Sequence, residues 1–140
     1  MAKDRATTSA AQEVAYIIDM DLNRQRGRSP EFMLFHRCCD ECRERIKSEQ
    51  RLPSERALLR DIVRCCSTRE GYLSAEMPLL EAAFRVMLSR GNEPISLRDL
   101  YHIVAEEWAT PLNPRNVTIE GFQRILERDS HYGFRAVPHK

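Results

Sequence analysis

Residues 79–91 read LLEAAFRVMLSRG, and this stretch decides the fold class. Its apolar side chains recur at helical spacing and lie on several faces, which predicts a central, largely buried helix from about Pro78 to Arg90. Gly91 and Asn92 follow it and predict a C-terminal cap. The same helical spacing continues through most of the chain on either side. The sequence therefore predicts a mainly α protein.

Downstream of this helix, two further helices and a strand are expected. Ser96, with Asp99 three residues later, is typical of a helix start, and it opens a helix that runs to about Trp108. Thr118 begins another helix that ends near Arg128. Residues 132–137 then alternate in the way a half-buried strand does. We expect this small terminal strand to pair near Ile95.

Upstream, the sequence predicts three helices. The first carries an apolar stripe of Val14, Ile17, Ile18 and Leu22. The second begins at Ser29 and Pro30, a favourable cap and first position, and runs to about residue 50. The third starts after Ser54 and closes near Gly71, so that helices two and three form an antiparallel hairpin. We expect a single domain over 1–140, with a helical half (1–73) packed on a second half (74–140).

Composition places the chain among soluble globular proteins. Of its 140 residues, 42% are hydrophobic and 31% are charged, which excludes wholesale disorder. No apolar run approaches the roughly 18 residues that cross a bilayer. The polar first eleven residues also lack the apolar segment of a secretory signal. These features predict a cytoplasmic location and no membrane partner.

The charge balance argues against a strongly basic nucleic-acid-binding surface. Twenty-two basic and 21 acidic residues give a net charge of +1, and the two signs are evenly distributed along the chain. Non-specific affinity for nucleic acid usually comes from an excess of basic residues. Folding could still gather basic residues on one face, so nucleic acid remains a possible partner.

Residues 79–137 resemble a winged helix-turn-helix unit. The resemblance rests on residues 79–91, on PISLRDLY at 94–101 and on TIEGFQRIL at 118–126. In that family a buried first helix ends in a glycine turn, a short extended segment precedes the second helix, and the third helix leads into a β-hairpin wing. The resemblance implies a DNA-binding regulator that places its third helix in the major groove. The candidate DNA contacts are Arg115, Gln123, Arg124, Arg128 and Arg135.

The sequence departs from this family in ways that favour protein docking. Two carboxylates, Glu120 and Glu127, share the outward face of the third helix with Arg124 and Arg128. Glu120 lies four residues before Arg124, which is the spacing of a helical ion pair. Only one strand is evident after the third helix, so a complete hairpin wing is not expected.

No catalytic signature is evident in the chain. The sequence has no phosphate-binding GxxxxGK[ST] loop, no GxGxxG, no GxSxG and no HExxH. The favoured hypothesis is therefore a non-enzymatic interaction or regulatory module. We expect it to form a homodimer through the stripe of Val14, Ile17, Ile18 and Leu22. A DNA-binding regulator is the alternative, and a thiol- or metal-based sensor is a third hypothesis.

Five cysteines fall in two groups and are expected to meet. The first group is Cys38, Cys39 and Cys42, and the second is Cys65 and Cys66. In the predicted hairpin, facing residue numbers sum to about 104, because the two helices run antiparallel and pack side by side. Cys39 should then meet Cys65, and Cys38 should meet Cys66.

Three interpretations fit this cysteine cluster. Buried free thiols can fill an apolar seam, a thiol pair can oxidise to a disulfide, or a zinc ion can recruit the thiolates together with His36. On one continuous helix, Cys38 and Cys39 would point roughly 100° apart, which argues against zinc. We therefore favour free thiols and no cofactor, with zinc as the alternative. The candidate metal ligands are Cys38, Cys39, Cys42, Cys65, Cys66 and His36.

Overall fold

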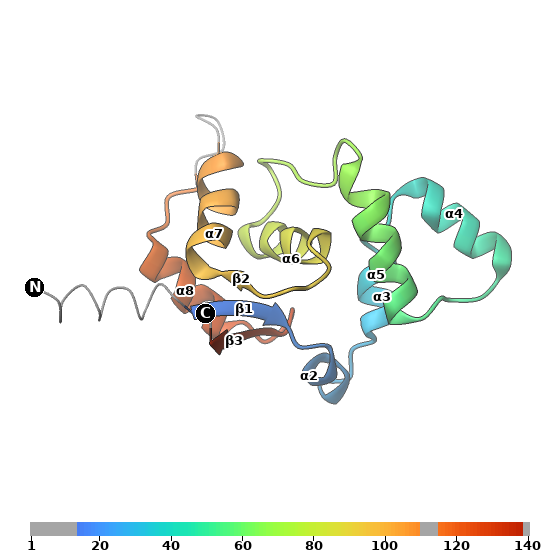
Figure 1. Cartoon of the computed structure of the whole chain (residues 1–140), viewed down its shortest axis with the longest axis horizontal. Coiled ribbons are helices and arrows are strands. Elements are labelled where there is room, and N and C mark those ends of the chain that lie inside the picture. Colours follow the sequence, from blue (N-terminus) through green and yellow to red (C-terminus); the bar gives the residue numbers. More distant parts are fainter. Residues whose placement is uncertain (1–13, 110–114, 139–140) are drawn as a thin grey trace, which may run out of the picture.

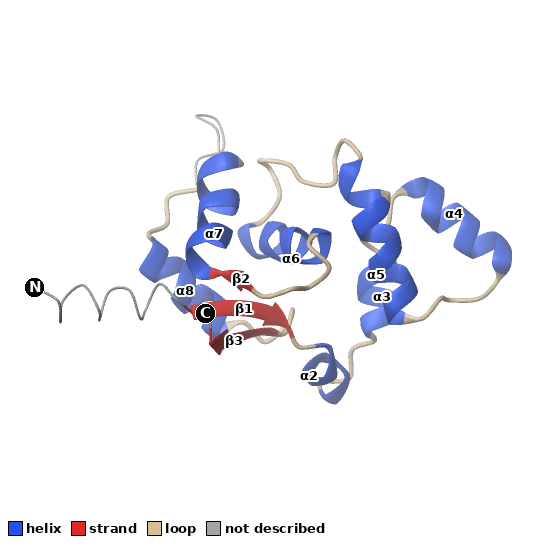
Figure 2. Ribbon diagram, viewed as in Figure 1, coloured by secondary structure: helices blue, strands red, loops and turns tan. Residues whose placement is uncertain are grey.

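The computed structural model describes residues 14–109 and 115–138, and within them the chain is mainly helical with one small sheet (Figures 1 and 2). The mainly α prediction is confirmed. The α-helices are α2 (Met20–Gln25), α3 (Pro30–Phe35), α4 (Asp40–Glu49), α5 (Glu55–Arg64), α6 (Leu79–Ser89), α7 (Leu97–Tyr101) and α8 (Ile119–Arg128). A 3-10 turn, η1 (Cys66–Thr68), and a π-helical segment, η2 (His102–Glu107), complete the helical elements.

The sheet is antiparallel and has the order β2-β1-β3. Its strands are β1 (Val14–Ile18), β2 (Ile95–Ser96) and β3 (Phe134–Pro138). The predicted terminal strand is confirmed as β3. Its expected pairing near Ile95 is wrong, because β1 lies between: Tyr16 is opposite Ile95 on one side and Ala136 on the other.

The predicted first helix is wrong, because Val14–Ile18 forms the central strand of this sheet. The run VAYII is continuously apolar, so it satisfies helical spacing, yet its β-branched and aromatic residues suit a strand buried on both faces. Ile18 is buried within its own chain. The predicted homodimer was based on a helical stripe of Val14, Ile17, Ile18 and Leu22. The structure does not contain that stripe, and the homodimer stays a prediction.

The predicted central helix is confirmed as α6, and it lies in the core of the molecule. Its Phe84, Met87 and Leu88 are fully buried. Asn92, with a φ of 59°, follows α6 and reaches β1. Its side-chain Oδ1 accepts the backbone N–H of Ile18 at 2.8 Å, and its Nδ2 donates to the Ile18 carbonyl at 2.9 Å. This side chain therefore extends the hydrogen bonding of the sheet to the end of α6.

The caps predicted in the C-terminal half are confirmed. The Ser96 hydroxyl accepts the N–H of Asp99 at 3.1 Å and begins α7. The Thr118 hydroxyl accepts the N–H of Gly121 at 3.0 Å and begins α8. These side chains satisfy backbone donors that the first helical turn leaves unpaired. Helix α7 then packs against α8, and η2, which continues α7, packs against α6.

The predicted continuous helix from residue 30 to about 50 is wrong, because α3 ends at Phe35 and α4 begins at Asp40. Its start is confirmed, with Ser29 capping the N–H of Phe32 at 3.2 Å. Beyond the break, α4 extends away from the body of the molecule (Figure 1). It buries only Cys42 and Ile46, so this arm has little apolar support of its own.

A half-buried carboxylate, Glu81 on α6, joins the two halves of the chain. Its side chain accepts hydrogen bonds from Arg37 at 2.7 and 2.9 Å, from Arg85 at 2.8 Å and from the Tyr132 hydroxyl at 2.9 Å. Burial acts to raise the Glu81 pKa, but the two guanidiniums outweigh it and hold that pKa at about 2. The carboxylate is therefore ionised at neutral pH.

We expect Gly133→Ala to destabilise the fold by about 1–3 kcal/mol. Gly133 has a φ of +87°, and an added Cβ would lie 2.7 Å from the fully buried amide group of Asn23. Gly27→Ala is the matched control, because Gly27 has a φ of +83° but no atom near its missing Cβ. Chemical denaturation measures both variants. If both variants lose the same free energy of unfolding, the contact of the added Cβ with Asn23 does not contribute to the effect at Gly133.

Candidate metal centre

Four of the five cysteine sulfurs converge on one point between α4 and α5. The Sγ atoms of Cys39, Cys42, Cys65 and Cys66 all lie within 4.8 Å of one another. Those of Cys39 and Cys65 are 3.9 Å apart, so the predicted meeting of the two cysteine groups is confirmed. All five cysteines are free thiols in the structure.

Two interruptions of the helices create this convergence. Cys39 is the N-cap of α4 in an extended conformation (φ −70°, ψ 165°), and Cys42 lies in the first turn of that helix. On the other side, Cys65 has left the helical conformation (φ −126°, ψ −62°) at the end of α5, and Cys66 begins η1. The adjacent Cys65 and Cys66 therefore both reach the cluster, although neighbours on a regular helix would point about 100° apart.

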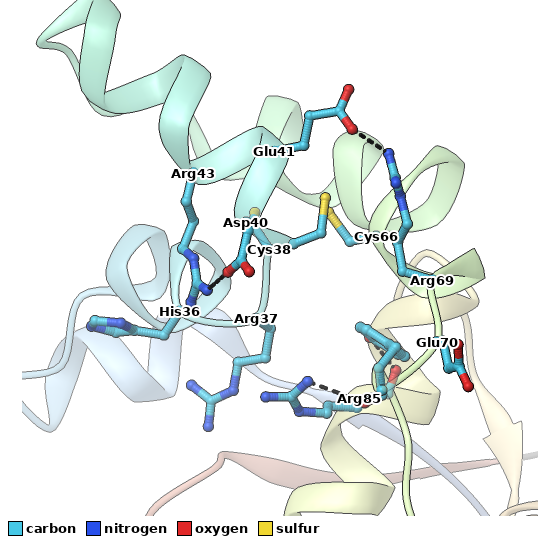
Figure 3. A pocket seen from close by; sticks show the side chains of 13 residues that line it. His36, Arg37, Cys38, Asp40, Glu41, Arg43, Cys66, Arg69, Glu70 and Arg85 are labelled. Atoms are coloured by element: carbon cyan, nitrogen blue, oxygen red, sulfur yellow. Dashed lines mark hydrogen bonds and ion pairs between the residues drawn. The ribbon is translucent and has the colours of Figure 1, made fainter.

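The argument against zinc that assumed a continuous helix was therefore wrong. The structure also separates two of the candidate ligands from the cluster. Cys38 is buried and its thiol donates to the Leu34 carbonyl at 3.5 Å. His36 stacks on Phe32 with ring centroids 6.3 Å apart, and Figure 3 shows its ring pointing away from the sulfurs. Four thiols remain as the candidate ligand set.

The geometry of these four sulfurs fits one tetrahedral metal ion. Zinc binds thiolate sulfur at about 2.3 Å, which places the sulfurs of a regular tetrahedron about 3.8 Å from one another. The Cys39–Cys65 separation of 3.9 Å matches this value, and the upper limit of 4.8 Å requires only small side-chain rotations. A set of four soft thiolates is typical of zinc or iron in proteins, and not of magnesium or calcium.

Burial keeps two of these thiols, Cys42 and Cys66, protonated in the absence of a metal. It raises the pKa of Cys42, and it raises that of Cys66 to about 12. Cys39 is different: burial acts to raise its pKa, but the backbone N–H of Cys42 and the neighbouring thiols together lower it below the usual value. A bound cation would supply the positive charge that the buried thiolates lack.

Arg69 supplies a positive charge at the edge of the cluster. Its guanidinium donates to the Cys65 sulfur at 3.5 Å and to Glu41 at 2.7 Å. The contact with the Cys65 sulfur is the main cause that raises the pKa of Arg69. This placement suits a metal centre of four thiolates, because such a centre with a divalent ion carries two negative charges.

A cavity of about 470 Å³ adjoins the cluster. Cys39 and Cys66 lie in its wall, together with the side chains of Arg37, Arg43, Arg69 and Arg85 (Figure 3). The cavity is open to solvent, and of its two cluster cysteines Cys39 is half-buried whereas Cys66 is 1% exposed.

The candidate DNA contacts differ in their surroundings. Arg115 is turned inward, and its guanidinium donates to the Met77 carbonyl at 2.6 Å. Arg135 pairs with Asp19 at 3.0 Å, and Gln123 is half-buried beside the Tyr16 hydroxyl. The remaining two candidates, Arg124 and Arg128, are exposed on α8.

Comparison with known proteins gives no relative for this chain. No protein-family model, no curated protein and no solved structure matches it significantly. Among the described residues, no helix has the length and apolar character needed to cross a membrane. Proposals about function therefore depend on the site itself.

Proposed function

We propose that this protein is a zinc-stabilised interaction module and that Cys39, Cys42, Cys65 and Cys66 bind the ion as thiolates. The observation that carries the proposal is the convergence of these four sulfurs within 4.8 Å. Four protein ligands fill the coordination sphere of zinc and leave no open position for a substrate. The proposed role of the metal is therefore structural, and the module is not an enzyme.

The ion would hold the α4 arm on the body of the protein. Two ligands begin α4 and the other two follow α5, so one ion would join the two segments at the point where both helices are interrupted. Other support for the arm comes from the buried Ile46 and from two ion pairs, Arg45 with Asp61 at 2.6 Å and Arg69 with Glu41 at 2.7 Å. Exposed ion pairs of this kind contribute little, so the metal would be the main constraint on α4.

We further propose that the C-terminal half is a winged-helix-like unit that binds a protein partner. Helices α6, α7 and α8 follow the order of a winged-helix unit, with β2 between the first two and β3 after the third. The strand beside β3 is β1 from the N-terminal part of the chain, where the family has a hairpin wing. Because Arg115 is turned inward and Arg135 is paired with Asp19, we propose a protein partner for this half.

The test is the metal content of the full-length protein. We expect purification without chelator to yield zinc in a stoichiometric amount, measured by inductively coupled plasma mass spectrometry. Removal of that zinc with a chelator under reducing conditions should lower the melting temperature, and added zinc should restore it, because a ligand bound only by the folded state stabilises it. Protein that takes up no zinc when reduced would refute the proposal.

A further inference from the structure

The four sulfurs differ in their exposure to solvent. Cys39 and Cys65 are half-buried, whereas Cys42 and Cys66 are 7% and 1% exposed. Cys39 also lies in the wall of the open cavity. A small oxidant in solution therefore reaches Cys39 more readily than it reaches Cys42.

The Sγ atom of Cys65, the other half-buried cysteine of the cluster, lies 3.9 Å from that of Cys39. Disulfides require a sulfur separation of about 2.05 Å and Cα atoms usually 4.4–6.8 Å apart. The adjacent pairs Cys38–Cys39 and Cys65–Cys66 are disfavoured, because consecutive Cα atoms lie only about 3.8 Å apart.

We infer that Cys39 is an oxidation site and that hydrogen peroxide joins it to Cys65, which releases the zinc. This inference rests on the proposed zinc site. It assigns to the cluster a second property, the loss of its metal in response to an oxidant.

The chemistry is balanced by one molecule of peroxide. The Cys39 thiolate attacks a peroxide oxygen, the O–O bond breaks, and a sulfenic acid forms while hydroxide leaves and takes up a proton. The Cys65 thiolate then attacks the Cys39 sulfur, and the S–S bond forms as a second hydroxide leaves and is protonated to water. Two thiolates lose two electrons in total, and peroxide gains them.

Loss of these two ligands would leave zinc with only Cys42 and Cys66. Structural zinc sites use four protein ligands, so the remaining pair cannot retain the ion in competition with a chelating dye. The released α4 arm would then be tethered mainly by the new disulfide. Reduction of that disulfide would restore the ligand set.

The experiment uses the full-length, zinc-loaded protein with excess reductant removed. Hydrogen peroxide is added in steps, released zinc is followed with the dye 4-(2-pyridylazo)resorcinol, and free thiols are then alkylated for peptide mapping. We expect zinc release in proportion to peroxide, a Cys39–Cys65 disulfide, and re-uptake of zinc after treatment with a thiol reductant. Cys38→Ser, which changes a buried thiol outside the cluster, should behave as the unchanged protein does.

Two results would overturn the inference. One is zinc that stays bound in excess peroxide, and the other is release accompanied by a different disulfide, such as Cys39–Cys42. The zinc content measured before peroxide is added separates these failures from failure of the proposed site. A protein that never binds zinc refutes both proposals.

Discussion

Cys42→Ser is expected to abolish stoichiometric zinc binding and to free the α4 arm. Cys42 is 7% exposed and its sulfur belongs to the cluster, so a serine hydroxyl would leave zinc with three thiolates. At free zinc about 1,000-fold above its dissociation constant, the stabilisation lost is about 4 kcal/mol. Zinc content and the zinc-dependent shift in melting temperature measure the effect. Hydrogen exchange should show faster exchange of α4 amides, while those of α6 stay protected.

The matched control is Cys38→Ser. Cys38 is also buried, at 4% exposed, and it lies in the same segment, but its thiol donates to the Leu34 carbonyl and its sulfur is not one of the four that converge. A serine hydroxyl can make the same hydrogen bond, so we expect full zinc content and a loss of stability of about 1 kcal/mol. Equal zinc content in the two variants would contradict the assignment of Cys42 as a ligand.

Glu81→Gln is expected to cost about 2–3 kcal/mol of folding free energy, because it leaves two half-buried guanidiniums without their carboxylate. The Arg37 and Arg85 side chains are 14% and 20% exposed, and both donate to Glu81. The substitution keeps the shape of the side chain and removes its charge. Chemical denaturation measures the loss. Glu44→Gln, the same change on the exposed side of α4, should alter stability by less than about 0.5 kcal/mol.

The same carboxylate predicts a pH dependence of stability. The pKa of Glu81 falls from 4.5 to about 2 on folding. Its contribution is therefore fully present above pH 4.5 and is lost as the pH falls through about 2, because the unfolded chain binds the proton more readily. We expect the difference in stability between the unchanged protein and Glu81→Gln to shrink over this range. A difference that stays constant with pH would show that the carboxylate's charge is not what stabilises the fold.

The elements with clear capping residues could be predicted from the sequence. Ser96 and Thr118 cap the helices that they were expected to begin, and α6 is the buried central helix. The strand at Val14–Ile18 could not be predicted in this way, because a short, continuously apolar run satisfies more than one periodicity. Its two neighbours in the sheet lie far away in the sequence, and only those contacts select the strand.

The metal centre could be predicted only in part. The spacing of the cysteines showed that the two groups would meet, but the helix break at residues 36–39 was missed. A signal for it exists: the interval from Cys39 to Cys42 is the C-x-x-C spacing that zinc sites use at the start of a helix. The apolar residues before and after residues 36–39 keep helical spacing, so the periodicity alone predicts one continuous helix there.

The most direct test of the account is the X-ray absorption spectrum of the zinc-loaded protein at the zinc edge. The account predicts a single shell of four sulfur ligands at about 2.3 Å and no nitrogen or oxygen in the first shell. Cys38→Ser should give the same spectrum, because that sulfur lies outside the cluster. A first shell that contains nitrogen, or fewer than four sulfurs in the reduced protein, would contradict the assignment of Cys39, Cys42, Cys65 and Cys66 as the complete ligand set.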